Sequence, residues 1–428
     1  MPNGNSFLRR WRWSLVWLGS AAALFALGRH AAPHSIDFIV YYRAVKSLIA
    51  GRTDLYSTTF SFGPPMTYVY PPLFLLLIFP IGWLSFANAF GTWFAATALA
   101  TAAAVRAAYK FWRPQSRAGY AWVMLALAGP YVIRALKSGN VQLLIVALTI
   151  YGVVEWGRKR RWISGGALAL GGAIKLIPLL LVPVFLVRRD WKLILRIGVV
   201  SVALWTLPIL YFGPRKTAAL CQTWYGKVLG HRQGFEKKRA LDESLAGSAE
   251  RLLTRVDYSR YADRHYPEVN FAALSARTER SITLFLSLCL LAASLWMCAQ
   301  LHDARDSDEA IAGRSREKRI AAAAGIFAAG QILVGPYTPM LYFSGLLLWA
   351  AVLPGIWPES KGSRRAILAL ATLNLALFAV PGSERQRLLQ ASGAFSLIVL
   401  LVWGWTMHAA WLVRKKRPRE AGSPDATA

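Results

Sequence analysis

Long apolar runs dominate the sequence and restrict the class of protein that it can form. Hydrophobic residues occupy 55% of the 428 positions, and they gather in continuous runs rather than at amphipathic spacing. A run of about 20 apolar residues crosses the ~30 Å hydrocarbon core of a bilayer as one helix. Because short basic clusters separate these runs, we predict an all-α, polytopic membrane protein with about twelve transmembrane helices.

The charge pattern and the cysteines exclude several other classes. The net charge is +29, yet the basic residues lie in short clusters between apolar runs, where they act as orientation signals; no nucleic-acid partner is expected. Cys221, Cys289 and Cys298 are far apart in the sequence, and the histidines have no ligand spacing, so neither a disulfide framework nor a metal site is indicated. The first apolar stretch, residues 13–27, lacks a small-x-small cleavage site and is expected to stay as an uncleaved span.

The topology follows from the basic clusters, with one question left open. Both ends of the chain are basic, which places both in the cytoplasm and requires an even number of spans. The run 163–187 forms either one span or a hairpin broken near Lys175 and Pro178; with a hairpin, one of the earlier short runs would have to be re-entrant. In either case two large loops, residues 29–71 and 213–280, fall on the same extracytoplasmic side. We expect one integral-membrane domain over residues 1–413 and a basic, disordered cytoplasmic tail over 414–428.

The first large loop carries the first candidate for chemistry. In residues 35–72, Asp37 stands just before the aromatic pair Tyr41 and Tyr42, and Tyr70 precedes the next apolar run. A carboxylate at the mouth of a membrane bundle is a candidate functional group. The alternative is that Asp37 caps a helix that begins at Phe38.

Polar residues inside the apolar runs are the next candidates. A lysine in mid-run, Lys175, costs roughly 2.5–3.5 kcal/mol to insert and needs a partner or an aqueous cavity. It would either anchor a lipid phosphate or extend from a hairpin tip to the headgroups. Asn140 and Gln142 stand at a helix start, where capping and an interhelical hydrogen bond are the alternative to substrate binding.

The second large loop contains an acidic pair followed by a basic residue. Asp242 and Glu243 precede a predicted helix start, and Arg251 follows within that helix. Carboxylates are favourable near the positive end of a helix, so capping is one interpretation. Contact with a substrate is the other.

Several of these pieces together resemble glycosyltransferase family 87. The Gly-Asn-Val-Gln sequence at residues 139–142 stands where the family usually has Gly-Gln-Val-Asn, and Asp-Glu-Ser-Leu at 242–245 stands where it often has Asn-Gln-Ser-Leu. The resemblance covers roughly residues 35–344. It also includes the segments Asp37-Phe38-x-x-Tyr41-Tyr42-x-Ala44, Leu48-x-Ala50-Gly51, Tyr68-x-Tyr70-Pro71-Pro72 and residues 171–178 with Lys175.

This resemblance implies a C-type glycosyltransferase in the cell membrane with its active site at the extracytoplasmic face. The donor would be a polyprenyl-phosphate sugar, most simply mannose, and the acceptor a glycolipid or glycan. Asp37 would be the general base that deprotonates the acceptor hydroxyl. With no second convincing carboxylate, we expect inversion at the anomeric carbon, and no cofactor or divalent metal. The predicted substrate-binding residues are Tyr41, Tyr42, Tyr70, Asn140, Gln142, Lys175, Asp242, Glu243 and Arg251.

One departure from the family keeps other functions open. The family often has a Trp-x-His-His-like motif in a late loop, whereas residues 335–342 here contain no histidine. A lipid or glycolipid transporter is one alternative, since broken helices and an intramembrane lysine suit that class. A catalytically inactive membrane scaffold is the other.

Overall fold

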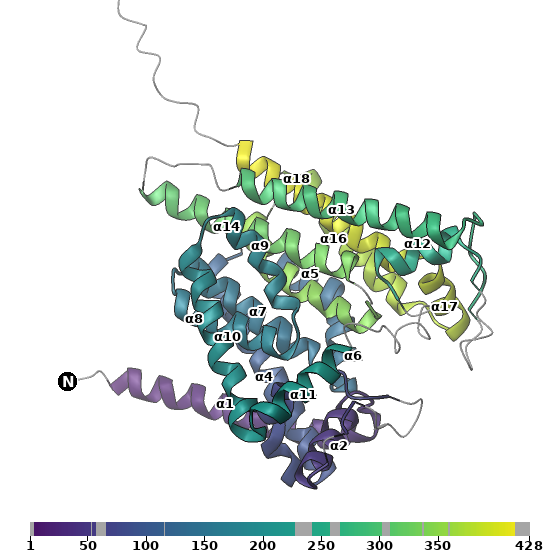
Figure 1. Cartoon of the computed structure of the whole chain (residues 1–428). Helices are drawn as coiled ribbons and strands as arrows, with labels where there is room; N and C mark the ends of the chain where they lie inside the picture. The colour runs from purple at the N-terminus through teal and green to yellow at the C-terminus, as the bar shows by residue number, and fades with distance from the viewer. Residues whose placement is uncertain are drawn as a thin grey trace, which may run out of the picture.

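The computed structural model describes residues 4–52, 54–56, 66–114, 116–226, 242–256, 266–301, 309–335, 338–357 and 360–415. Throughout these residues the regular structure is helical, which confirms the all-α prediction for this part of the chain (Figure 1). Residues 416–428, most of the predicted tail, lie outside the described residues; Arg414 and Lys415 continue the last helix, α18 (Ala394–Lys415).

Five helical segments in the described residues have the length and apolar composition to cross a membrane. The prediction of about twelve spans exceeds this number, and the remaining apolar helices are shorter. The five segments are Leu15–His34, Arg117–Ser138, Trp191–Phe212, Ala276–Gln300 and Ala394–Arg414; the shorter ones are Pro72–Trp83, Gln142–Gly157, Ile177–Val187 and Met340–Ile356.

Glycines bring the first two long helices together. Helix α1 (Gly4–Ala31) packs along α4 (Phe86–Trp112). A methyl group at Gly28 would lie 2.7 Å from Phe94 Cβ, and one at Gly91 would lie 2.9 Å from the carbonyl oxygen of Phe25. Small residues at a crossing let two helix backbones approach closely. The contact places the end of α1, and therefore the first loop, beside the start of α4.

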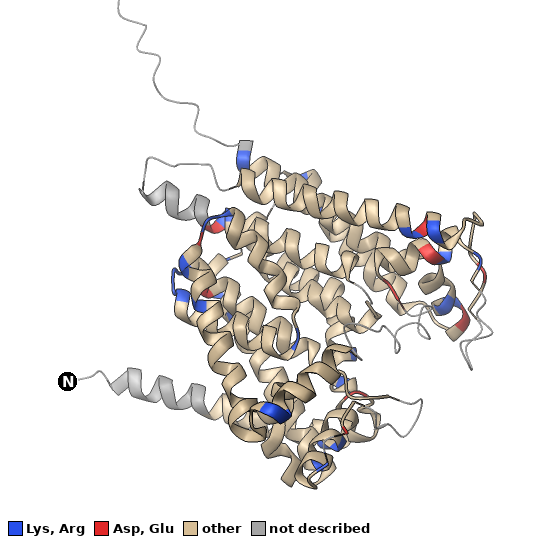
Figure 2. Ribbon diagram, in the orientation of Figure 1, with Lys and Arg blue, Asp and Glu red and all other residues tan. Residues whose placement is uncertain are grey.

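The run that contains Lys175 folds as a hairpin, which answers the open topological question. Helix α8 (Arg161–Ile174) ends at Lys175, and the chain returns through η4 (Ile177–Leu181) and α9 (Val182–Val187). The Arg161 guanidinium lies 2.9 Å from the Asp190 carboxylate, so the start of α8 and the end of α9 meet. The basic clusters 158–161 and 188–192 therefore lie at one end of the bundle, which we call the basic end (Figure 2).

The run 72–84 forms one short apolar helical segment. It forms α3 (Pro72–Ile78) and η2 (Phe79–Trp83), and both of its ends contact the short helix α2 (Phe38–Ile49). Tyr70 pairs with Tyr41 at one end, and Tyr42 donates a 2.8 Å hydrogen bond to the Leu84 carbonyl at the other. At 12 residues, the helical part Pro72–Trp83 is shorter than the roughly 20 residues that a helix needs to cross the hydrocarbon core.

The two predicted loops meet at the end opposite the basic end, which we call the loop end. The second loop contains α11 (Pro214–Trp224) and α12 (Leu245–Leu253). The indole N–H of Trp224 donates a 3.2 Å hydrogen bond to the carbonyl of Val69 in the first loop. In Figure 1, α2 and α12 lie toward the right, and the start of α8 lies at the left. Helix α13 (Ala276–Gln300) begins a turn earlier than the predicted loop boundary at residue 280.

Candidate functional site

Asp37 occupies the first position before α2, but its side chain does not cap that helix. The short turn η1 (Ala32–His34) delivers the chain to this point, and the Asp37 backbone N–H donates a 3.0 Å hydrogen bond to the carbonyl of Ser138. No capping hydrogen bond forms from its carboxylate. The capping interpretation is therefore wrong. The half-buried Asp37 carboxylate lies at the loop end.

A glycine turn fixes the backbone on the other side of Asp37. Helix α6 (Gly129–Ser138) ends at Gly139 with a φ of 70°, a conformation that favours glycine. A Cβ atom at Gly139 would lie 2.5 Å from Phe38 Cβ and 2.7 Å from Phe90 Cε2. The indole of Trp93 donates a 2.9 Å hydrogen bond to the Gly139 carbonyl. The turn before α7 (Gln142–Gly157) is thus packed directly against the residue that follows Asp37.

Two of the three predicted tyrosines face this turn. The hydroxyl groups of Tyr41 and Tyr70 lie 3.0 Å apart, and the backbone N–H of Val141 donates to Tyr41 over 3.4 Å. Burial raises the pKa of both phenols, and the nearby charge of Asp37 raises each further, so both stay neutral hydrogen-bonding groups. Tyr42 turns away to the Leu84 carbonyl, so the structure does not place it in this group.

Asn140 and Gln142 both form hydrogen bonds with other residues of the protein. The Asn140 side-chain oxygen accepts a 2.8 Å hydrogen bond from the backbone N–H of Gln142, and both residues are buried. The Gln142 side-chain oxygen in turn accepts a 3.2 Å hydrogen bond from the ammonium of Lys175. The N-cap of α7 is Val141, which makes no side-chain capping bond, whereas the predicted interhelical hydrogen bond is confirmed. Through this bond the turn next to Asp37 also holds the hairpin tip.

Lys175 is held within the bundle rather than extended to the headgroups. Its ammonium lies 3.5 Å from the ring centroid of Tyr342 and interacts electrostatically with the Asp37 carboxylate. The preceding residue, Ile174, belongs to the same buried apolar cluster as Phe38 and Tyr41. We call Asp37, Tyr41, Tyr70, Gln142, Lys175 and Tyr342 the Asp37 cluster. Tyr342 was missed from the sequence, because nothing in residues 335–342 indicates a contact with a lysine so distant in the chain.

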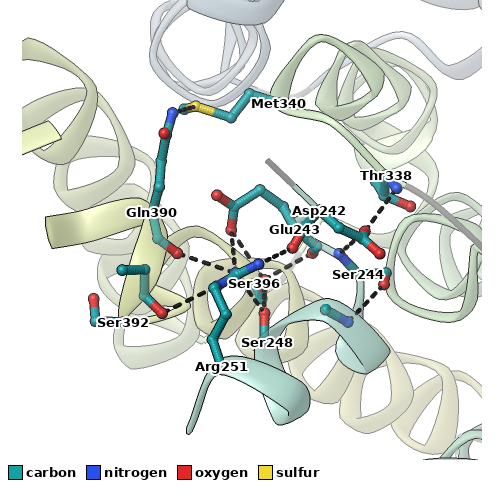
Figure 3. Close-up of polar contacts among 12 residues, drawn as sticks. Asp242, Glu243, Ser244, Ser248, Arg251, Thr338, Met340, Gln390, Ser392 and Ser396 are labelled. Atoms are coloured by element: carbon teal, nitrogen blue, oxygen red, sulfur yellow. Dashed lines mark hydrogen bonds and ion pairs between the residues drawn. The ribbon is translucent and has the colours of Figure 1, made fainter. Parts of the chain in front are cut away.

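Asp242 and Glu243 take part in a second group of contacts, which clasp a late segment of the chain (Figure 3). Asp242 Oδ1 accepts from the backbone N–H of Ser244 and from that of Thr338, each over 2.9 Å. The backbone N–H of Glu243 donates to the Thr338 carbonyl over 2.9 Å. Ser244 caps α12, as its hydroxyl accepts from Gly247 N–H over 3.1 Å. The helix start predicted here is confirmed, with Ser244 as the cap.

Arg251 fastens this group to the last two helices, α17 (Ser383–Ala391) and α18. Its guanidinium donates to the main-chain oxygens of Asp242, Gln390 and Ala391, and lies 3.5 Å from Glu243 Oε2. The Arg251 side chain is 1% exposed and that of Glu243 is fully buried. The hydrogen bonds of Asp242, Glu243 and Arg251 connect α12 with Thr338 and with the last two helices, so these three residues form a group distinct from the Asp37 cluster. Their substrate-binding role stays a prediction.

Glu243 predicts a pH-dependent stability. Burial raises the pKa of its carboxyl to about 8, against the opposing effect of Arg251. An unfolded glutamate releases its proton near pH 4.5, so from there up to about pH 8 the folded state binds more protons than the unfolded state. We therefore expect the free energy of unfolding to fall as the pH rises through this window, by at most about 1.4 kcal/mol per pH unit.

Thermal unfolding of the lipid-embedded protein between pH 5 and pH 9 measures this effect. Glu243→Gln, which carries no titrating proton, should flatten the dependence. An unchanged slope in that variant would contradict the assignment.

The sequence also matches the profile of a known family. The profile of glycosyltransferase family 87 matches residues 68–315, more than half of the chain, and the chain belongs to that family. The matched region contains Asn140, Lys175 and the second loop, but not Asp37 or Tyr342, so it is narrower than the residues 35–344 expected. With its apolar helices, the chain is a membrane protein of this family.

Two relatives from Mycobacterium tuberculosis are similar over part of the chain. A polyprenol-phosphate-mannose-dependent alpha-(1-2)-phosphatidylinositol mannoside mannosyltransferase is 30% identical over 211 residues, 44% of this chain and 49% of the relative. An alpha-(1->3)-arabinofuranosyltransferase is 32% identical over 176 residues, 39% of each chain. The alignments thus span about half or less of these curated relatives.

Proposed function

We propose that the protein transfers a hexose, most simply mannose, from a polyprenyl-phosphate donor to a glycolipid or glycan acceptor at the extracytoplasmic face of the cell membrane. The observation that carries this proposal is the Asp37 cluster itself. A carboxylate that does not cap its own helix lies with a lysine ammonium and two neutral phenols at the loop end. A base for the acceptor and a cation for the donor phosphate are thus supplied by neighbouring segments.

The reaction needs one base and one leaving group. The acceptor hydroxyl oxygen attacks the anomeric carbon, the bond from that carbon to the phosphate oxygen breaks, and polyprenyl phosphate leaves with the bonding electrons. Asp37 takes the proton of the hydroxyl as it attacks. The Lys175 ammonium has three N–H donors, and Gln142 and Tyr342 account for one hydrogen bond and one ring contact among the described residues. A donor phosphate at Lys175 would put charge stabilisation where the negative charge develops.

Inversion follows from a single displacement. A retaining enzyme needs a second carboxylate about 5 Å from the first to act as nucleophile. The other acidic pair considered, Asp242 and Glu243, is buried in contacts of its own. The stereochemistry of the product therefore tests the role given to Asp37.

The position of the basic end supports an active site on the extracytoplasmic side of the membrane. Lysines and arginines are concentrated in cytoplasmic loops of membrane proteins. The clusters 158–161 and 188–192 lie at the end opposite the Asp37 cluster, which favours an extracytoplasmic active site.

Purified protein in lipid, supplied with radiolabelled polyprenyl-phosphate-mannose and a panel of glycolipid and glycan acceptors, tests the proposal. We expect a radiolabelled product of inverted configuration, unaffected by a chelator of divalent ions. Polyprenyl-phosphate-arabinose in a parallel reaction decides between the sugars that the two relatives' names contain. Lipid-linked sugar that crosses the bilayer unchanged, without product, would instead indicate a transporter.

A further inference from the structure

The late segment that carries Tyr342 connects the two groups of polar contacts. At its start, the Thr338 backbone N–H donates to Asp242 Oδ1 and the Thr338 carbonyl accepts from the Glu243 backbone N–H, each over 2.9 Å. Met340 follows, and its sulfur accepts from the side-chain amide of Gln390 over 2.7 Å (Figure 3). Four residues after Thr338, in η8 (Met340–Gly345), Tyr342 places its ring against Lys175. The segment is therefore anchored at one end and meets the proposed donor site at the other.

The contact between Tyr342 and Lys175 has the geometry of a cation–π interaction. The ammonium nitrogen lies 3.5 Å from the ring centroid, well inside the limit of about 6 Å for such contacts. The Tyr342 backbone N–H is bound to the Pro339 carbonyl over 2.8 Å, which fixes the main chain from which the ring projects. The ring is thus a rigid surface, whereas the lysine carries its charge on a flexible four-carbon stem.

We propose that Tyr342 is a positioning residue, which holds the Lys175 ammonium toward the phosphate of a lipid-linked donor, and that the Asp242–Thr338 clasp holds Tyr342 in place. This inference rests on the proposed function and deepens it. Holding a flexible side chain in its bound conformation before the ligand arrives removes the ordering cost from the binding step. Gln142 contacts the ammonium by a hydrogen bond and Tyr342 contacts it by its ring, so the two residues together fix its direction.

Two substitutions at Tyr342 separate positioning from bulk packing. Tyr342→Phe keeps the ring and should bind polyprenyl phosphate, the probe, within about 2-fold of the unmodified protein, as the cation–π contact is retained. Tyr342→Leu removes the ring and should weaken binding about 5- to 30-fold. The KM for the lipid-linked donor should rise in parallel, with a smaller change in kcat. Tyr225→Leu, an exposed tyrosine at the loop end, is the matched control.

The clasp is tested by coupling. Asp242→Ala removes the oxygen that accepts from Thr338, whereas Asp242→Asn keeps one at Oδ1. We expect the alanine variant to weaken polyprenyl phosphate binding and the asparagine variant to keep it. In the double variant Asp242→Ala/Tyr342→Leu, the fold-loss in affinity should be smaller than the product of the two single fold-losses. Contacts that act through one another show such non-additivity.

The binding assay distinguishes this inference from the proposed function. Protein in lipid nanodiscs, with its thermal midpoint measured for each variant, gives binding without any need for turnover. If the unmodified protein does not bind polyprenyl phosphate, the donor proposal fails. If it binds and the folded Tyr342→Leu variant binds equally well, the positioning role is overturned while the donor proposal stands.

Discussion

Replacing Asp37 with asparagine is expected to lower the rate of sugar transfer by roughly 10²–10⁴-fold, the usual contribution of a general base. Asparagine has nearly the same shape but cannot take a proton from the acceptor hydroxyl. The carboxylate makes no capping bond to α2, so the change removes no cap from that helix. Donor binding and the thermal midpoint should therefore stay close to those of the unmodified protein. The measurement is initial rate with labelled donor, alongside binding of polyprenyl phosphate.

The matched control is Glu268→Gln, which removes an exposed carboxylate from the second loop. We expect this variant to keep its activity. Asp37→Asn protein with full transfer activity would remove Asp37 from the mechanism. A variant that loses both activity and folding would make Asp37 a structural residue.

The second large effect concerns stability. Arg251→Met should lower the free energy of unfolding by several kcal/mol, because each buried acceptor left without its donor costs about 1–3 kcal/mol. Methionine fills part of the space but donates no hydrogen bond. The main-chain oxygens of Asp242, Gln390 and Ala391 would then lose a buried donor, and Glu243 would lose its neighbouring cation. Thermal or denaturant unfolding in nanodiscs measures the loss.

Arg255→Met serves as the control for this stability measurement. Arg255 is exposed at the end of the same described segment, and surface substitutions of this kind usually change stability by less than about 0.5 kcal/mol. If the two variants unfold at the same temperature, Arg251 does not fasten α12 to the last helices.

The sequence predicts the helical class and much of the topology, because runs of apolar residues and basic clusters carry that information locally. Lys175 and Pro178 mark the break that becomes the hairpin tip. Residues 72–84 show where local information ends. Their composition resembles a short span, and only the contacts of Tyr70 and Leu84 with α2 show that the segment packs against that helix.

The candidate site also combines residues that the sequence predicts with residues that only tertiary packing places. Asp37, Tyr41, Tyr70, Gln142 and Lys175 were singled out from the sequence, and the structure brings them together. Tyr42 is directed elsewhere, since adjacent residues of a helix face different sides. Asp242 and Arg251 look like loop residues in the sequence, but tertiary packing makes them a buried clasp.

Tyr342 could not be predicted from its neighbours. Its contact with Lys175 depends on how the late segment is anchored at Thr338, far from the hairpin in the sequence. The absence of histidines from residues 335–342 does not indicate which residue of this stretch contacts the lysine. A periodic pattern can assign a side chain to a face, but it cannot assign that face to a partner.

The roles proposed for Asp37 and Lys175 are tested most directly by an experimental structure of the Asp37→Asn protein in nanodiscs with an intact polyprenyl-phosphate sugar bound. We expect the phosphate to lie within hydrogen-bond distance of the Lys175 ammonium, with the anomeric carbon facing residue 37 at the loop end. A donor bound at the basic end, or one whose sugar points away from residue 37, would contradict these roles.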